Sequence, residues 1–272
     1  MSFIPTTNNF APSVTVYPQI DSDTYEGRIV RVIALGMQNK TKLVPNGKGG
    51  WTPSTLPQDT KPCFKLSLQI ELIGMQSKGT KWELEGNKWQ VKEEYSARPT
   101  CVFHDVWLYP NLSRGNFFDL LQSLDPSVTK VPADLDYFRD VMLGAPLNVT
   151  VKSVPARQSA EDAAYGKPLR YFNNIKGTAG MSARIKKGLP AAESQLVFFD
   201  CYDGGEEMQA AYAELPKFQR DMLTEATDSV NIPLAGTEPI ERPAPEEQGK
   251  APVKETPVAD VEEMDFSDDI PF

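Results

Sequence analysis

Tryptophan and lysine residues recur together in this sequence. Trp51 lies in a Gly- and Pro-rich segment with lysines on both sides, and Trp82 and Trp89 each directly follow a lysine. Tryptophan rings can stack on the bases of a single-stranded nucleic acid, and lysines can neutralise its phosphates. The combination predicts a nucleic-acid interface, with packing inside a loop or across a hairpin as the alternative. The candidate contact residues are Lys40, Lys42, Lys48, Trp51, Lys61, Lys65, Trp82 and Trp89.

A second basic stretch, residues 152–190, contains eight basic and two acidic side chains. Near its centre, residues 169–175 alternate as in a strand, so that Leu169, Tyr171 and Ile175 share one face. We expect that face to join the core, and the opposite face and the flanking lysines to contact nucleic acid. These further candidates are Lys167, Arg170, Phe172 and Lys176. A solvated surface without a ligand is the alternative explanation of both basic stretches.

The sequence contains few residues that could act in catalysis or bind a metal. His104 is the only histidine, and the pair Cys101-x-x-His104 could bind zinc only if the two other cysteines converged on it. Cys101 and His104 also have opposite parity on a strand, so they should face opposite sides. The glycines at 47–50 lack the following Lys-Ser/Thr of a phosphate-binding loop. We therefore predict no catalytic residue, no metal and no cofactor, and a protein that is not an enzyme.

Negative charge is concentrated at the C-terminal end. The chain has 272 residues and a net charge of −9, and the last 36 residues carry −8 of it, from eleven acidic and three basic side chains. The same stretch holds six prolines and only two aromatic residues, too little apolar surface for a core. We expect an extended N-terminal arm at 1–20, a folded domain at 21–232 and a disordered, Pro-rich acidic tail at 233–272.

Alternating apolar residues predict the strands that position the candidates. The clearest case is 63–73, where the even-numbered residues are apolar and the odd-numbered ones between them polar, as in a half-buried strand. Phe103 and Trp107 share a face of their strand and are expected in the core. A long Gly- and Pro-rich loop is expected at 39–62. The five main strands are predicted at 25–35, 63–73, 100–109, 147–154 and 169–175, with a hairpin at 81–84 and 88–91 and a last strand at 196–202.

Helices are predicted between the third and fourth main strands, at 113–124 after a Ser113 cap and at 134–143. A further helical stretch at 207–226 should break at Pro216. Five strands with a helix between the third and fourth follow the order of the OB-fold, a five-stranded Greek-key barrel that binds oligonucleotides. We predict a mainly β OB-fold with long loops and inserted helices; another small barrel or a two-layer α+β domain fits almost as well.

The last nine residues, MDFSDDIPF, join an acidic cluster to an apolar Ile-Pro-Phe terminus. They closely resemble the C-terminal tip of bacterial single-stranded DNA-binding proteins, in which DF-x-DDIPF ends a Pro-rich linker. Ser267 stands where an acid is common in that family. The body does not follow the usual bacterial version, so the resemblance is to a divergent relative of the kind carried by bacteriophages. It implies that partner proteins bind to Asp265, Phe266, Asp268, Asp269, Ile270, Pro271 and Phe272.

The resemblance also implies what the chain does. It would bind and coat single-stranded DNA with little sequence specificity in replication, recombination and repair, and its tip would recruit host or phage replication and repair proteins. We expect it in the bacterial cytoplasm, free or as a homo-oligomer and without a membrane anchor, because it shows no secretory signal and no apolar run of about eighteen residues. The alternatives are a recombination mediator or annealing protein, and a DNA-processing enzyme with the tip as a docking tail.

Deleting Phe272 alone tests the tip. The deletion removes a large apolar side chain and moves the terminal carboxylate onto Pro271, so partner docking should weaken roughly tenfold or more. Affinity for single-stranded DNA should stay the same. A pull-down from bacterial lysate with full-length and shortened protein measures the first effect, and an oligo-dT titration measures the second. Equal partner recovery from both proteins would show that the resemblance carries no function here.

Overall fold

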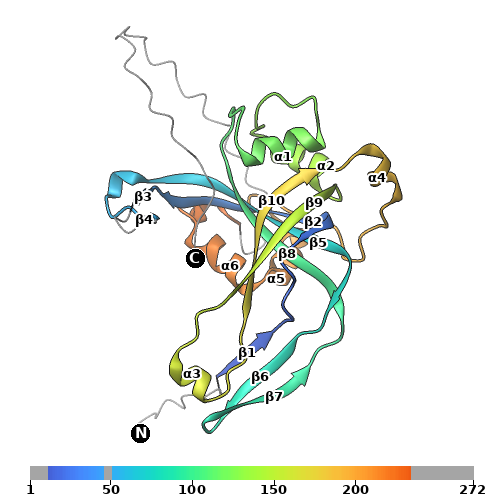
Figure 1. Cartoon of the computed structure of the whole chain (residues 1–272). Helices are drawn as coiled ribbons and strands as arrows, with labels where there is room; N and C mark the ends of the chain where they lie inside the picture. Colours follow the sequence, from blue (N-terminus) through green and yellow to red (C-terminus); the bar gives the residue numbers. More distant parts are fainter. Residues whose placement is uncertain (1–11, 46–50, 234–272) are drawn as a thin grey trace. The chain divides into compact units, whose positions relative to one another are not determined.

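The computed structural model describes residues 12–45 and 51–233 (Figure 1). Strands make up 43% of these residues and helices 24%, so the protein is mainly β. The predictions for residues 1–11, for Lys48 and for the tail from 234 onward, with its tip, lie outside the described residues.

The elements include every main strand that the sequence predicts, with additions. The strands are β1 (Ser13–Val16), β2 (Thr24–Thr41), β3 (Leu43–Pro45), β4 (Trp51–Pro53), β5 (Thr60–Ser77), β6 (Thr80–Glu85), β7 (Lys88–Glu94), β8 (Arg98–Leu108), β9 (Pro146–Pro155), β10 (Tyr171–Gly180) and β11 (Val197–Phe199). The helices are α1 (Asn116–Leu124), α2 (Leu135–Met142), α3 (Ala160–Ala164), α4 (Ala183–Gly188), α5 (Glu206–Glu214) and α6 (Lys217–Glu225), with short 3-10 turns η1 (Pro57–Asp59) and η2 (Ser229–Asn231).

The largest sheet has six strands. Five of them follow the order β10-β9-β2-β5-β8, and β11 pairs in parallel with β2. β2 runs antiparallel to β9, from Thr24 opposite Thr150 to Arg28 opposite Pro146. β9 also pairs antiparallel with β10. Two smaller sheets, β1-β6-β7 and β3-β4, complete the described strands, so the predicted hairpin at 81–91 gains β1 from the expected arm.

The chain divides into two compact units, each with its own buried residues. Of the described residues, unit 1 holds 12–28, 69–104 and 146–195, and unit 2 holds the rest. β2, β5 and β8 each contribute residues to both units. Buried aliphatic residues of unit 1 include Ile70, Leu72, Leu147 and Val149. Buried residues of unit 2 include Ile33, Leu35, Leu66, Leu68, Leu121 and Phe138.

A run of apolar residues explains the central place of β2. Ile29, Val30 and 32–35 are at most 1% exposed, so both faces of the strand are covered in unit 2. In unit 1 the same strand carries Gly27, where a Cβ atom would lie 2.8 Å from the Ile70 side chain. Glycine therefore permits a close approach to β5 that any other residue would prevent.

Residues 39–62 hold more regular structure than their Gly and Pro content predicts, so the expected long loop is wrong. β2 and β5 extend into this segment from either side, and β3 pairs antiparallel with β4 between them. A backbone hydrogen bond from Lys42 N to Asp59 O, 2.8 Å long, joins the two sides of the ribbon. The glycines that suggested a loop fall in 46–50, outside the described residues.

The polar face of β5 is largely buried, contrary to the predicted half-exposed strand. Ser67 is 0% exposed and Glu71 is 3% exposed. In unit 2, Ser67 Oγ donates to Asp105 Oδ1 (2.7 Å) and accepts from Gln219 Nε2 of α6 (3.0 Å). In unit 1, the Glu71 carboxylate accepts the backbone N–H groups of 193–194, at 2.9 and 2.7 Å. Ser67 and Glu71 are thus buried but hydrogen-bonded, and alternation along one strand does not reveal partners that come from elsewhere in the chain.

The end of the described chain is fastened to β2 within unit 2. The Asp228 carboxylate accepts hydrogen bonds from Met37 N (2.9 Å) and from the Tyr202 hydroxyl. Thr227 N donates to Met37 O at 2.8 Å. Burial and the Asp228 carboxylate raise the pKa of Tyr202, so its hydroxyl keeps the proton that it donates. These contacts fix the segment from which the acidic tail continues.

One helix start differs from the prediction, and one break agrees with it. α1 begins at Asn116, after Gly115 with a φ of +100°, so Ser113 does not cap it. A left-handed φ suits a residue without a side chain, which explains why the helix starts there. Asp134 caps α2 by accepting a hydrogen bond from the N–H two residues on. The break predicted at Pro216 is confirmed between α5 and α6.

Glu71→Ala tests the buried hydrogen bonds of unit 1. The change leaves two partly buried N–H groups without their acceptor and opens a small cavity, so the free energy of unfolding should fall by about 1–3 kcal/mol. Glu71→Gln keeps one acceptor oxygen and should lose less. Denaturant unfolding measures both, with the exposed Glu94→Ala on β7 as control. A loss for Glu71→Ala no larger than that of the control would contradict the assignment.

Candidate nucleic-acid interface

One face of β8 carries aromatic residues that are open to solvent. Val102, Val106 and Leu108 are buried at 2–6% exposure, whereas Phe103 is 37% exposed and Trp107 is partly exposed. The expectation that Phe103 and Trp107 belong to the core is therefore wrong. The aliphatic residues of opposite parity fill the core, and the aromatic ones are left on the outer face.

Trp107 and Tyr109 are flanked by two lysines from neighbouring strands of unit 2. Lys40 Nζ of β2 lies 5.3 Å from the centroid of the Trp107 ring and 5.0 Å from that of Tyr109. Lys65 Nζ of β5 lies 5.4 Å from the Trp107 ring centroid. All three distances are within the range of cation–π attraction. We call Lys40, Lys65, Trp107 and Tyr109 the aromatic–lysine cluster.

Lys65 donates to acceptors on β8 and α6, which set its position. Its ammonium lies 2.8 Å from Asp105 Oδ2 and 3.7 Å from Met222 Sδ of α6. Met222 O also accepts from Gln38 Nε2 of β2, at 2.9 Å. α6 thus covers the part of the sheet face beside the cluster, and Lys65, with a side chain 14% exposed, lies where this cover meets the cluster.

The Cys63 thiol is buried beside the cluster. It is 8% exposed and lies 3.5 Å from Leu108 O. Burial raises the pKa of the Cys63 thiol, while a hydrogen bond with Tyr109 and the charge of Lys40 act in the opposite direction. The buried thiol therefore lies next to both Tyr109 and Lys40 of the cluster.

The other candidates of the first basic stretch lie at the same end of β2 and β5. Lys42 and Lys61 are exposed, and the Thr41 and Thr60 hydroxyls, 2.9 Å apart, join the two strands between them. The backbone of Trp51 belongs to β4, and its side chain lies outside the described residues.

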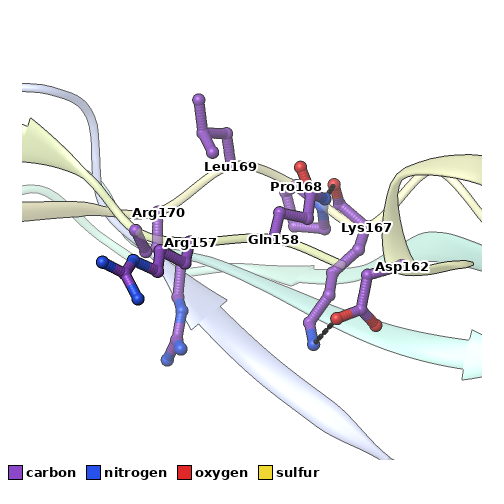
Figure 2. A pocket seen from close by; sticks show the side chains of 8 residues that line it. Arg157, Gln158, Asp162, Lys167, Pro168, Leu169 and Arg170 are labelled. Atoms are coloured by element: carbon purple, nitrogen blue, oxygen red, sulfur yellow. Dashed lines mark hydrogen bonds and ion pairs between the residues drawn. The ribbon is translucent and has the colours of Figure 1, made fainter. Parts of the chain in front are cut away.

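In unit 1, Trp89 and Lys167 come together from distant parts of the sequence. Lys167 Nζ lies 5.4 Å from the centroid of the Trp89 ring, and Trp89 N donates to Tyr165 O at 2.9 Å. Figure 2 shows Lys167 reaching Asp162, with 3.0 Å between Nζ and Oδ2. Asp162, Lys167 and Arg170 line a cavity of about 20 Å³, which holds no more than one water molecule. A polymer could therefore touch these cations only from outside.

The remaining candidates of unit 1 are partly or fully exposed. Phe172 is 52% exposed, and Arg170 and Lys176 are exposed as well, in agreement with their predicted outward face. Leu169 was expected in the core but is 41% exposed, because β10 begins only at Tyr171. Trp82 lies opposite Val14 of β1 and Val91 of β7 and is partly exposed.

Trp107 and Tyr109 are the binding candidates that the sequence analysis missed. The signal was present in the parity of the strand, since Asp105, which an apolar core would not accept unpaired, shares their face. The aliphatic residues of the strand have the opposite parity. Counting aromatic residues as core by default concealed this pattern.

Two other kinds of site do not occur among the residues that the structure describes. Within them, no group of three or more His, Cys, Asp or Glu side chains is arranged to hold a metal ion. No helix in the same part of the chain has the length and apolar character to cross a membrane.

Comparisons with protein-family models, with curated proteins and with solved structures find no match to this chain.

Thiol reactivity tests the surroundings of the cluster. Cys63 and Cys201 should react slowly with a disulfide reagent at mildly alkaline pH, because burial raises the pKa of both thiols and leaves little thiolate. The partly exposed Cys101 should react first, which the Cys101→Ser variant would establish by losing the fast phase.

Lys40→Met should slow the Cys63 reaction further, since the Lys40 charge lowers the pKa of that thiol. Stopped-flow absorbance on the folded protein resolves the phases. A Lys40→Met protein of unchanged melting temperature that reacts faster would contradict the position of Lys40 beside Cys63.

Proposed function

We propose that this chain is an OB-fold protein that binds and coats single-stranded DNA with little sequence specificity. The observation that carries the proposal is the aromatic–lysine cluster, in which Lys40 of β2 and Lys65 of β5 lie beside the rings of Trp107 on β8 and of Tyr109 just after it. Stacking platforms beside cations are what a sequence-tolerant single-strand site requires.

The strand order supports the OB-fold part of the proposal. If β2, β5, β8, β9 and β10 are numbered one to five, their order in the sheet is 5-4-1-2-3. An OB-fold barrel has this order, and α1 and α2 fall between its third and fourth strands, as a helix does in that fold. The other strands are additions to the five.

The distribution of the candidates over these elements is a second support. OB-folds bind oligonucleotides on the face of strands two and three and through the loops after strands one and four. In this numbering β5 carries Lys65 and β8 carries Trp107, and Tyr109 directly follows the last residue of β8. The loop after strand one carries Lys42, Lys48 and Trp51, and the loop after strand four carries Lys167 and Arg170.

The chemistry of the cluster suits single-stranded DNA of any sequence. A base can stack on Trp107 because every base has a π face, and a phosphate can approach Lys40 or Lys65 beside the ring. Few side chains of the cluster could form hydrogen bonds with the edges of bases, so the site would discriminate only weakly among the four bases. Binding would weaken strongly with salt, since each neutralised phosphate releases counterions.

The C-terminal tip supplies the second half of the proposed function. Its resemblance to the tip of bacterial single-stranded DNA-binding proteins supports recruitment of replication and repair proteins, in the cytoplasm of a bacterial or phage-infected cell. In this proposal the chain performs no chemistry of its own, and holds DNA at the folded body and partners at the tip.

Trp107→Leu tests the proposed interface. If the ring stacks a base, its loss should weaken oligo-dT binding by about 1–3 kcal/mol, and Trp107→Phe should lose less. Fluorescence anisotropy of labelled oligo-dT measures this, with duplex DNA as the competing ligand. The matched control is Phe198→Leu on β11, because Phe198 also pairs with a cation, Arg139, at 5.7 Å in the same unit.

Equal affinities of Trp107→Leu and Phe198→Leu for oligo-dT, with both proteins folded, would remove the cluster from the interface. Failure of the unaltered protein to prefer oligo-dT over duplex DNA would remove the proposed function itself.

A further inference from the structure

The ammonium group of Lys65 already has three partners within the protein. Asp105 Oδ2 lies 2.8 Å away, Met222 Sδ lies 3.7 Å away, and the Trp107 ring centroid lies 5.4 Å away. The carboxylate accepts one of the three N–H donors in a short ion pair, the thioether is a weak acceptor, and the ring attracts the charge. A phosphate that approaches Lys65 therefore competes with the Asp105 carboxylate for the ammonium.

The Asp105 carboxylate is held from the interior and not by Lys65 alone. Its Oδ1 accepts from Ser67 Oγ at 2.7 Å, and Ser67 Oγ accepts from Gln219 Nε2 at 3.0 Å. Ser67 and Gln219 are both 0% exposed. The Asp105 side chain itself is 31% exposed, so one end of the network reaches solvent while the other is buried.

We propose that Asp105 is a built-in competitor of the nucleic-acid phosphate for Lys65, an inference that rests on the proposed function. Of the three partners of the ammonium, only the carboxylate is an anion, so a phosphate, which is also an anion, would take its place. When single-stranded DNA binds, the Lys65–Asp105 pair opens and Lys65 turns to a phosphate of the DNA. When the DNA leaves, the pair closes again, because the hydrogen bonds from Ser67 and Gln219 have kept the carboxylate in place.

This competition limits affinity and speeds release. Binding at Lys65 exchanges one charge-assisted hydrogen bond for another, so the net gain is smaller than for a lysine without an internal anion. The re-formed pair also stabilises the empty site. The consequence appears mainly in the dissociation rate, where affinity differences between variants of one interface usually lie.

Asp105→Asn separates this role from a structural one, because it removes the charge and keeps the size and a hydrogen-bond acceptor for Ser67. Oligo-dT affinity at low salt should rise roughly two- to fivefold. The plot of log affinity against log salt should steepen by up to about 0.7, the contribution of one more phosphate contact to a single strand. Dissociation, followed by stopped-flow with unlabelled competitor, should slow by a similar factor. Loss of a merely structural contact would lower affinity.

Two control variants exclude a general effect of charge. Asp140→Asn on α2 removes the same charge in the same unit, and Arg139, which pairs with Asp140 at 3.0 Å, keeps its second ion pair with Asp136 at 3.0 Å, so this variant should gain less affinity than Asp105→Asn. In a Lys65→Met background, Asp105→Asn should gain no more than that control, because no lysine remains to be released. Thermal unfolding of each protein establishes that all are folded.

The outcomes distinguish the two levels of the proposal. Salt-dependent oligo-dT binding by the unaltered protein, without a gain for Asp105→Asn beyond Asp140→Asn, overturns the competitor role and leaves the proposed function standing. The same gain with and without Lys65 also overturns it. No salt-dependent binding by the unaltered protein overturns both.

Discussion

The hydrogen bond between Gln219 and Ser67 joins α6 to β5 in unit 2, and the cover of this part of the sheet face depends on it. It joins two side chains that are both 0% exposed, and it lies between α6 and β5. A buried amide or hydroxyl without a partner destabilises a fold by roughly 1–3 kcal/mol, so this pairing restricts where α6 can lie. The aromatic–lysine cluster begins where that cover ends, and Lys65 contacts both, through Met222 and through Trp107.

The cluster is ordered before any ligand arrives. Lys40 and Lys65 are long side chains that would otherwise lose rotamer freedom on binding, and the attraction of the rings already confines them. A site organised in this way needs less ordering free energy when it binds a partner. β8 carries Trp107 on the binding face and buried aliphatic residues on its opposite face. One strand therefore stabilises both the binding face and the core.

Alternation along the sequence was sufficient to find the five main strands but not β1, β3 or β4, because it depends only on residues that are neighbours. It identified the apolar face of β5 and the outward face of Phe172 for this reason. Alternation does not reveal what covers a polar face. Ser67 meets Gln219, 152 residues later in the chain, and Glu71 meets the N–H groups of 193–194, so these pairings arise only in the folded chain. The parity of β8 places Trp107 opposite the buried aliphatic residues, but the lysines beside its ring come from two other strands, and their approach arises only in the folded chain.

The hydrogen bonds of Thr227 and Asp228 with Met37 fix the place in unit 2 from which the acidic tail starts. Phe272 follows Pro233 by 39 residues, so even a fully extended chain places it no farther than about 140 Å from that residue. A protein docked at the tip would thus be confined to a small volume around β2, whatever its concentration in the cell. Confinement of this kind raises the effective concentration of a partner without any new contact. Because Met37 lies three residues before Lys40, the tether starts beside the strand that contributes to the cluster.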